Sequence, residues 1–216
     1  MIQIIPAILT AAPEELKLLL SKAEGVVERV QIDIIDGVFA ANKTIDPSIL
    51  ENIDTNLKVD FHLMTKEPVD WVERCVRGMA DRIIGQVEQI SNQIEFIGKV
   101  QEVGASVGLA IDIKTPVSKI EPAIITSLDV VLVMSVPAGF GGQTFDNRVL
   151  DKIKELDEIR VRDDTPFRIC DDGGVTLENI GDVRVTGVDE VAIGKKIFEG
   201  NLKDNIEKYR KAMYKE

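Results

Sequence analysis

The chain has 216 residues, 44% of them hydrophobic, and a formal net charge of −11. This length and composition suffice for one large hydrophobic core. The negative net charge argues against a function in binding nucleic acids or anionic membranes, because both need clustered basic charge. Two cysteines, Cys75 and Cys170, are too few for a disulfide framework. Without a signal-like segment after Met1 or a long apolar run, the sequence predicts a cytoplasmic protein.

Short apolar runs rich in isoleucine and valine recur along the chain, and a segment with helical periodicity follows each of them. The predicted strands are residues 3–9, 29–35, 57–64, 82–87, 106–111, 130–136, 167–170 and 190–193. Signals for helix starts lie between several of these strands, at Thr10, Pro68, Pro116 and Thr176. The last predicted helix covers residues 201–214 and becomes basic toward its end, as the helix dipole favours.

The alternation of strands and helices predicts the fold class. Strands this apolar are covered on their outer face, and strands that each return through a helix run parallel. Eight repeats predict an α/β protein with a single (β/α)8 TIM barrel, formed by residues 1–216 as one domain. A doubly wound parallel sheet is the alternative. In a barrel, the C-terminal ends of the strands surround the mouth in which active sites lie.

Two aspartates come from strands on different sides of the predicted barrel mouth. Asp33 belongs to the second strand, and Asp172 follows the seventh, two residues after its predicted end. Two carboxylates that face each other can serve as general acid and general base on opposite faces of one carbon, which is what an epimerase needs. The alternative is that each aspartate only caps the helix after its strand.

His62, the only histidine of the chain, belongs to the third predicted strand. By alternation its side chain faces the barrel interior, as a packed residue or as a ligand. With Asp33 and Asp172 it could form a mixed nitrogen and oxygen site for a divalent metal, Zn, Mn or Fe. The fourth ligand would then be Gln31, which is neutral and a poor ligand.

Glycines follow the last three predicted strands, where a barrel commonly binds phosphate. They are Gly141 and Gly142 after the sixth strand, Gly173 and Gly174 after the seventh, and Gly194 after the eighth. Glycine lets the backbone approach a ligand, and helix N-termini supply N–H groups. The pattern predicts a phosphate cradle, to which Lys195 would add a positive charge. Met64 and Met134 are most simply core residues.

These motifs resemble the ribulose-phosphate 3-epimerase family, with its allulose-6-phosphate epimerase relatives, along nearly the whole chain. The matching segments are residues 6–9, 31–37, 39–42, 44, 59–64, 132–136, 139–143, 172–174 and 197–198. The resemblance implies an isomerase of carbohydrate metabolism that acts on a ketose phosphate. It places Asp33 and Asp172 on the acid–base pair that also binds a divalent metal, and His62 on a metal-binding histidine. It places the five glycines on the phosphate loops, and Met64 and Met134 in the reaction pocket.

The sequence departs from the family pattern mainly in the same pocket. Gln31 replaces a metal-binding histidine, Ala7 replaces a serine that touches substrate, and Gln86 replaces a histidine at the end of the fourth strand. Further departures are Ile35, Val38, Pro137, Ala138 and Lys195. The glycines of the phosphate loops are kept, whereas one of the metal-binding histidines is lost. We therefore expect the metal to be weakly bound or absent.

Three functions are compatible with this pattern. The first is a 3-epimerase of the pentose phosphate pathway that interconverts D-ribulose 5-phosphate and D-xylulose 5-phosphate. The second is a phosphosugar isomerase or lyase that needs no metal, and the third is a catalytically silent relative that binds phosphosugars. In each case the partner is a small sugar phosphate. The family likeness allows a homo-oligomer, for which the sequence itself shows no interface.

Overall fold

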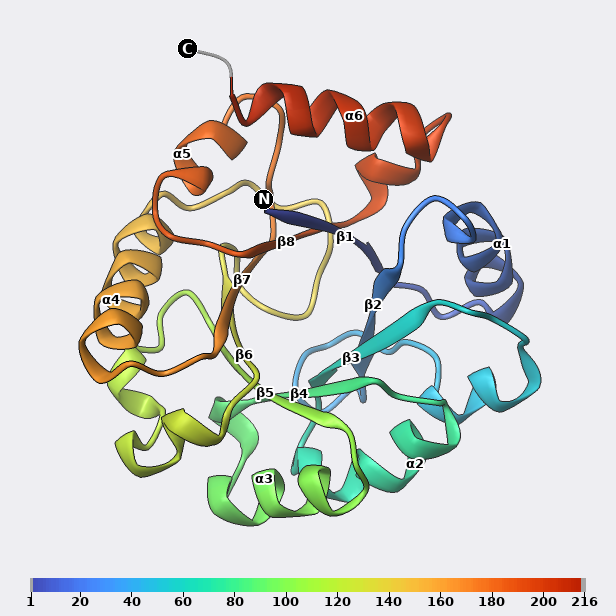
Figure 1. Cartoon of the computed structure of the whole chain (residues 1–216). Coiled ribbons are helices and arrows are strands. Elements are labelled where there is room, and N and C mark those ends of the chain that lie inside the picture. Colours follow the sequence, from blue (N-terminus) through green and yellow to red (C-terminus); the bar gives the residue numbers. More distant parts are fainter. Residues whose placement is uncertain (1, 215–216) are drawn as a thin grey trace.

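The computed structural model describes residues 2–214, in which eight parallel strands form a closed barrel surrounded by helices (Figure 1). The strands are β1 Gln3–Ile8, β2 Arg29–Ile35, β3 Lys58–Met64, β4 Arg82–Gln86, β5 Ser106–Ile111, β6 Val130–Met134, β7 Arg168–Asp172 and β8 Glu190–Ile193. Each strand pairs with the next one in the chain, and β8 pairs with β1 to close the ring. The predicted (β/α)8 barrel is confirmed, and the open doubly wound sheet is wrong.

The connections between the strands contain both α-helices and 3₁₀ helices. The α-helices are α1 Pro13–Ala23, α2 Val72–Arg77, α3 Gln93–Glu102, α4 Arg148–Asp163, α5 Ile180–Arg184 and α6 Leu202–Ala212. The 3₁₀ helices are η1 Pro47–Asn52, η2 Pro68–Trp71, η3 Val87–Gln89, η4 Val117–Lys119, η5 Pro122–Ser127 and η6 Lys195–Phe198. No helix within residues 2–214 has both the length and the apolar character needed to cross a membrane.

Two predicted helices differ from those in the structure. After Pro116 the chain forms only η4 and η5, because the second proline, Pro122, lacks the N–H that a continuous helix would need. After the predicted cap Thr176 the helix begins three residues later than expected, at Ile180. The Thr176 N–H donates to Asn179 Oδ1 at 2.7 Å, and this turn precedes the helix.

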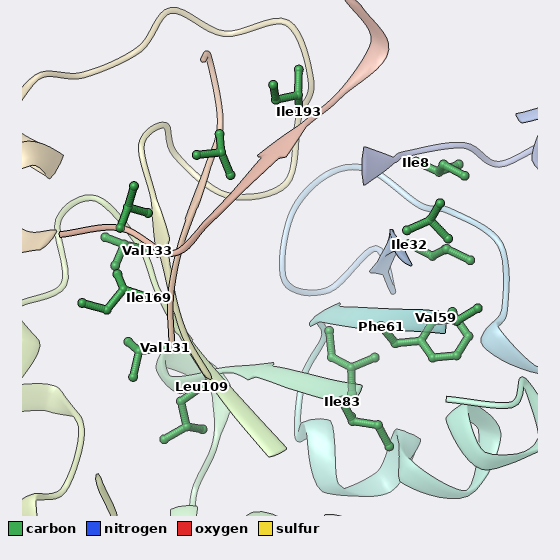
Figure 2. Close-up of a cluster of buried hydrophobic side chains, with 14 of the residues drawn as sticks. Ile8, Ile32, Val59, Phe61, Ile83, Leu109, Val131, Val133, Ile169 and Ile193 are labelled. Atoms are coloured by element: carbon green, nitrogen blue, oxygen red, sulfur yellow. The ribbon is translucent and has the colours of Figure 1, made fainter. Parts of the chain in front are cut away.

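Alternate residues of each strand face opposite sides of the barrel wall. The outward side chains pack against the helices in one large apolar layer, and Figure 2 shows Ile32, Phe61 and Val131 among them. A smaller apolar cluster fills the interior, with Leu132 and Cys170 among its members. The large outer layer supplies most of the buried apolar area, so the inward positions near the mouth are free to carry polar side chains.

A buried ionic cluster closes the N-terminal end of the barrel. Arg82 at the start of β4 donates to Asp60 Oδ2 at 2.5 Å and to Glu190 Oε2 at 2.7 Å. Arg29 pairs with Asp60, and Arg168 Nε lies 2.9 Å from Glu190 Oε1. Asp60 and Glu190 are both almost fully buried. Paired charges therefore occupy the barrel interior at its N-terminal end.

Candidate functional site

The two aspartates and the histidine singled out above lie together at the mouth of the barrel. Asp33 on β2 is directly paired with His62 on β3, and Asp172 is the last residue of β7. His62 Nδ1 lies 3.2 Å from Asp33 Oδ1 and 3.7 Å from Asp172 Oδ2. Both aspartates lie within strands, and the helices that follow begin after Asp46 and Asn179. The helix-capping alternative is therefore wrong.

Gln31 lies between the two carboxylates. Its side chain points inward from β2 and is fully buried. Its Nε2 donates to Asp33 Oδ1 at 2.9 Å and to Asp172 Oδ2 at 2.6 Å. Among residues 2–214, its Oε1 is one of few buried side-chain atoms without a hydrogen-bond partner. The amide nitrogen thus joins the two acids, while the amide oxygen has no hydrogen-bond partner.

The same four side chains have the composition of a divalent metal site. One atom each of Asp33, His62 and Asp172 lies within 4.8 Å of the other two. A half-turn of the Gln31 amide would replace its NH₂ group with the unpartnered Oε1 and bring a fourth donor toward the carboxylates. A set of one imidazole nitrogen and three oxygens suits Zn, Mn or Fe. The residues therefore fit such a metal.

Burial and mutual charge shift the proton equilibria of this site. Burial and the nearby charge of Asp33 raise the pKa of Asp172 to about 7, against the opposing effects of His62 and Gln31. Burial disfavours the charged form of His62, but its hydrogen bond to Asp33 and the charges of both aspartates raise its pKa overall. A carboxyl group that titrates near neutral pH can both give and take a proton, as acid–base catalysis needs.

The glycine loops lie beside this site. By strand register Met134 pairs with Asp172, and Met64 is buried two residues beyond His62. Gly174, with a φ of +64°, packs against the loop after β6, where an added Cβ would lie 2.6 Å from the Phe145 nitrogen. Glycines 141, 142, 173 and 194 lie in the loops after β6, β7 and β8. Gly194 and Lys195 are exposed where η6 begins.

Replacing Gly174 by alanine tests the predicted phosphate cradle. We expect the KM for a phosphosugar to rise by about tenfold, the equivalent of about 1.4 kcal/mol, because the positive φ and the contact with Phe145 force the loop to move. Steady-state kinetics would measure it. Gly25→Ala is the matched control, since Gly25 has a φ of +70° but no atom within 4 Å of its added Cβ. Equal KM values in the two variants would contradict the prediction.

Sequence reasoning missed two polar side chains at the site, Glu88 and Asp171, and named Gln86 only as a departure from the family pattern. Gln86 faces His62 from the end of β4, and Glu88 lies just beyond it. Asp171 is buried on the outer side of β7, where Ser135 Oγ donates to it and burial raises its pKa to about 8. Each is a polar residue at or near the end of an apolar strand, which is the signal that could have found it.

Comparison with known proteins agrees with this geometry. The profile of the Ribulose-phosphate 3 epimerase family matches residues 3–198. Ribulose-phosphate 3-epimerase from Bacillus subtilis is 34% identical over 205 residues, which cover 92% of this chain and 93% of that protein. The enzyme of the same name from Aquifex aeolicus is 33% identical, and the match covers 81% of this chain and 79% of that protein.

Solved structures with lower identity share the fold alone. A 3-keto-L-gulonate-6-phosphate decarboxylase from Vibrio cholerae superposes with a TM-score of 0.66 at 15% identity, covering 99% of this chain and 96% of that one. Such a likeness shows the barrel but leaves the chemistry open. The family profile and the identities above are what settle the relationship. The chain belongs to the ribulose-phosphate 3-epimerase family, whose named members are isomerases acting on carbohydrate phosphates.

Proposed function

We propose that this protein is a ketose-phosphate 3-epimerase that interconverts D-ribulose 5-phosphate and D-xylulose 5-phosphate. The observation that carries the proposal is the position of Asp33 and Asp172, two buried carboxylates held by one amide nitrogen at the barrel mouth. Family membership supports the reaction type, and the glycine loops after β6, β7 and β8 support a phosphate-bearing substrate.

The reaction requires removal of a proton from C3 and its return on the other face. One aspartate takes the proton from C3, which leaves an enediolate, and the other gives a proton to the opposite face of the same carbon. The raised pKa of Asp172 allows that residue to hold a proton at neutral pH, so that it can be the donor while Asp33 acts as the base. In the reverse direction the two residues exchange roles.

The other residues of the site orient these two groups. Gln31 holds the two carboxylates near each other, and His62 Nδ1 lies beside the same oxygens. Asp33, His62 and Asp172, with Gln31 Oε1 as the fourth donor, are the residues that would hold a divalent metal. When bound, such a metal supplies Lewis-acid stabilisation of negative charge on substrate oxygens.

The amide of Gln31 favours a second candidate, a phosphosugar isomerase that works without metal. Its NH₂ group lies against the two carboxylates that would ligate the metal, so the site is held together by hydrogen bonds alone. A protein with this arrangement could exchange the C3 proton after complete chelation of metals. Activity that survives chelation would favour this candidate, and activity that requires added metal would favour the first.

Proton NMR in D₂O tests both candidates directly. The protein is incubated with D-ribulose 5-phosphate, with a chelator and then with added Zn²⁺, Mn²⁺ or Fe²⁺. We expect loss of the C3 proton signal together with the appearance of xylulose 5-phosphate. Exchange without the second product would indicate another reaction on the same sugar. Absence of exchange under every condition would contradict the epimerase proposal and favour a phosphosugar-binding role.

Replacing Gln31 by histidine should strengthen metal binding. A histidine supplies an imidazole nitrogen in place of a weak amide ligand. Because changes in residues that only support metal ligands already alter metal affinity by about 10-fold to 100-fold, we expect a gain of at least about 10-fold. Titration of the metal-free protein with Zn²⁺ would measure the change. Gln93 is a buried glutamine on α3 whose side chain contacts Lys119 and Glu121, so Gln93→His controls for an added histidine. Equal Zn²⁺ affinity in Gln31→His and the unchanged protein would contradict the prediction.

A further inference from the structure

Gln86, the last residue of β4, is fully buried beside His62. Its amide can take two orientations, which exchange the positions of its nitrogen and its oxygen. In one of them the oxygen faces the carbonyl of Ala110 and the carboxylate of Glu88, which are both acceptors. In the other, the nitrogen donates to Glu88 Oε2 at 2.6 Å and to Ala110 O at 3.2 Å. Only the second orientation satisfies all these groups.

Glu88 is itself held in place from the next strand connection. The Asp112 N–H donates to Glu88 Oε1 at 2.8 Å, which leaves Oε2 for the amide of Gln86. Glu88 lies in the short helix η3 directly after β4. The orientation of Gln86 is therefore imposed by two acceptors, a backbone carbonyl on β5 and an anchored carboxylate.

This orientation determines which nitrogen of His62 carries hydrogen. The Gln86 oxygen lies 3.1 Å from His62 Nε2, and an amide oxygen can only accept. Nε2 must therefore be the donor. The other ring nitrogen, Nδ1, faces Asp33 Oδ1 and Asp172 Oδ2 across the site.

We propose that Gln86 and Glu88 are positioning residues that keep a hydrogen on Nε2 of His62, so that Nδ1 can serve as a metal ligand. Without them the ring would favour the opposite tautomer, because the Asp33 carboxylate is a strong acceptor for an Nδ1 hydrogen. That hydrogen would occupy the direction in which Nδ1 must offer its lone pair. The metal-binding part of this inference rests on the proposed function, whereas the position of the hydrogen is a property of the metal-free chain.

Nitrogen-15 NMR can test the inference without substrate. Because His62 is the only histidine, a long-range proton–nitrogen correlation spectrum contains one imidazole and needs no assignment. Nε2 couples to both ring protons and Nδ1 mainly to one, so each nitrogen is identified by its pattern. At a fixed pH at which the ring is neutral, we expect Nε2 of the metal-free protein to have the shift of a nitrogen that bears hydrogen. A lone-pair shift at Nε2 would overturn the proposal.

Variants of Gln86 test whether this residue is the cause. Gln86→Met keeps the length of the side chain but removes the acceptor, so we expect Nε2 to lose its hydrogen and Zn²⁺ affinity to fall by about 10-fold to 100-fold. Gln86→Glu retains an oxygen opposite Nε2, and its other oxygen, when protonated, can donate to Glu88 as the amide does. It should restore the hydrogen on Nε2 and a Zn²⁺ affinity within a few-fold of that of the unchanged protein. Gln93→Met removes a buried glutamine whose amide bonds to Lys119 and Glu121, and controls for the loss of a buried amide.

A second variant covers the case in which Gln86→Met does not fold. Glu88 is only partly buried, and Glu88→Ala removes the carboxylate that orients the amide. We expect the same direction of change at Nε2, with a smaller effect because Ala110 still accepts from Gln86. If Nε2 and the Zn²⁺ affinity are unchanged in both variants, the positioning role is wrong. Neither the Nε2 shift nor the Zn²⁺ affinity is measured with a phosphosugar. Failure of the epimerase proposal can therefore be distinguished from failure of this inference.

Discussion

Replacing Asp172 by asparagine should reduce C3 proton exchange by about 100-fold to 10,000-fold, the range that general acid–base groups contribute. Asparagine keeps the shape of the side chain and can accept the hydrogen bond from Gln31, but it cannot take or give a proton at neutral pH. Asp33→Asn should have an effect of similar size, because epimerisation needs an acid on one face and a base on the other. The rate of C3–H loss in D₂O measures both.

Asp171 offers a control in the neighbouring position. It is also a buried acid, but it faces the outer side of β7 and bonds to Ser135. Asp171→Asn removes a buried carboxyl group next to the site without changing the proposed acid–base pair. We expect it to retain most of the exchange rate. An equal loss in Asp171→Asn and Asp172→Asn would mean that the effect arises from packing or charge and not from proton transfer.

Replacing Arg82 by methionine should lower the free energy of unfolding by about 3–5 kcal/mol, the usual cost of breaking a buried ion pair from one side. Arg82 is the partner shared by Asp60 and Glu190, and both acids would remain buried at the N-terminal end of the barrel. Urea unfolding would measure the loss. Arg210→Met is the control, since the pair of Arg210 with Glu207 is about half exposed and should contribute less than about 1 kcal/mol.

The stability loss in Arg82→Met should depend on pH. Burial already raises the pKa of Asp60, and the charge of Arg82 opposes that rise. Without Arg82, the folded state therefore binds a proton at Asp60 more tightly than the unfolded state does. Stability then decreases as pH rises from about 4, the ordinary pKa of an aspartate. The difference from the unchanged protein should be smallest in acid and grow toward neutral pH, and a constant difference would contradict this explanation.

The strand pattern could be read from the sequence because each strand is covered by helices and is therefore continuously apolar. Strand ends were less predictable where polar residues belong to the strand. β7 extends to Asp172, two residues beyond its predicted end, because Asp171 and Asp172 continue the barrel ladder while breaking the apolar run. The sequence also did not show that η4 and η5 are 3₁₀ helices, because segments this short cannot distinguish the periodicity of a 3₁₀ helix from that of an α-helix.

The site was predictable in its acids and its histidine, and less so in the amides around them. Gln31 was expected only as a poor metal ligand, whereas the structure has its nitrogen joining both carboxylates. Nothing in the sequence indicates which end of an amide faces a carboxylate, because this depends on acceptors brought together by the fold. The same holds for Gln86, whose orientation is imposed by Glu88 and by a carbonyl on β5.

The acids of the site lie on strands, whereas the glycines lie on the loops after them. Asp33 and Asp172 are held by a closed hydrogen-bonded ring, so insertions and substitutions in the loops leave their spacing unchanged. Natural variation can therefore reshape the loops for which we propose sugar-phosphate binding, while the proposed acid–base pair is inherited unchanged. A lineage built on this barrel can change its substrate in small mutational steps, each of which keeps a folded protein with working chemistry.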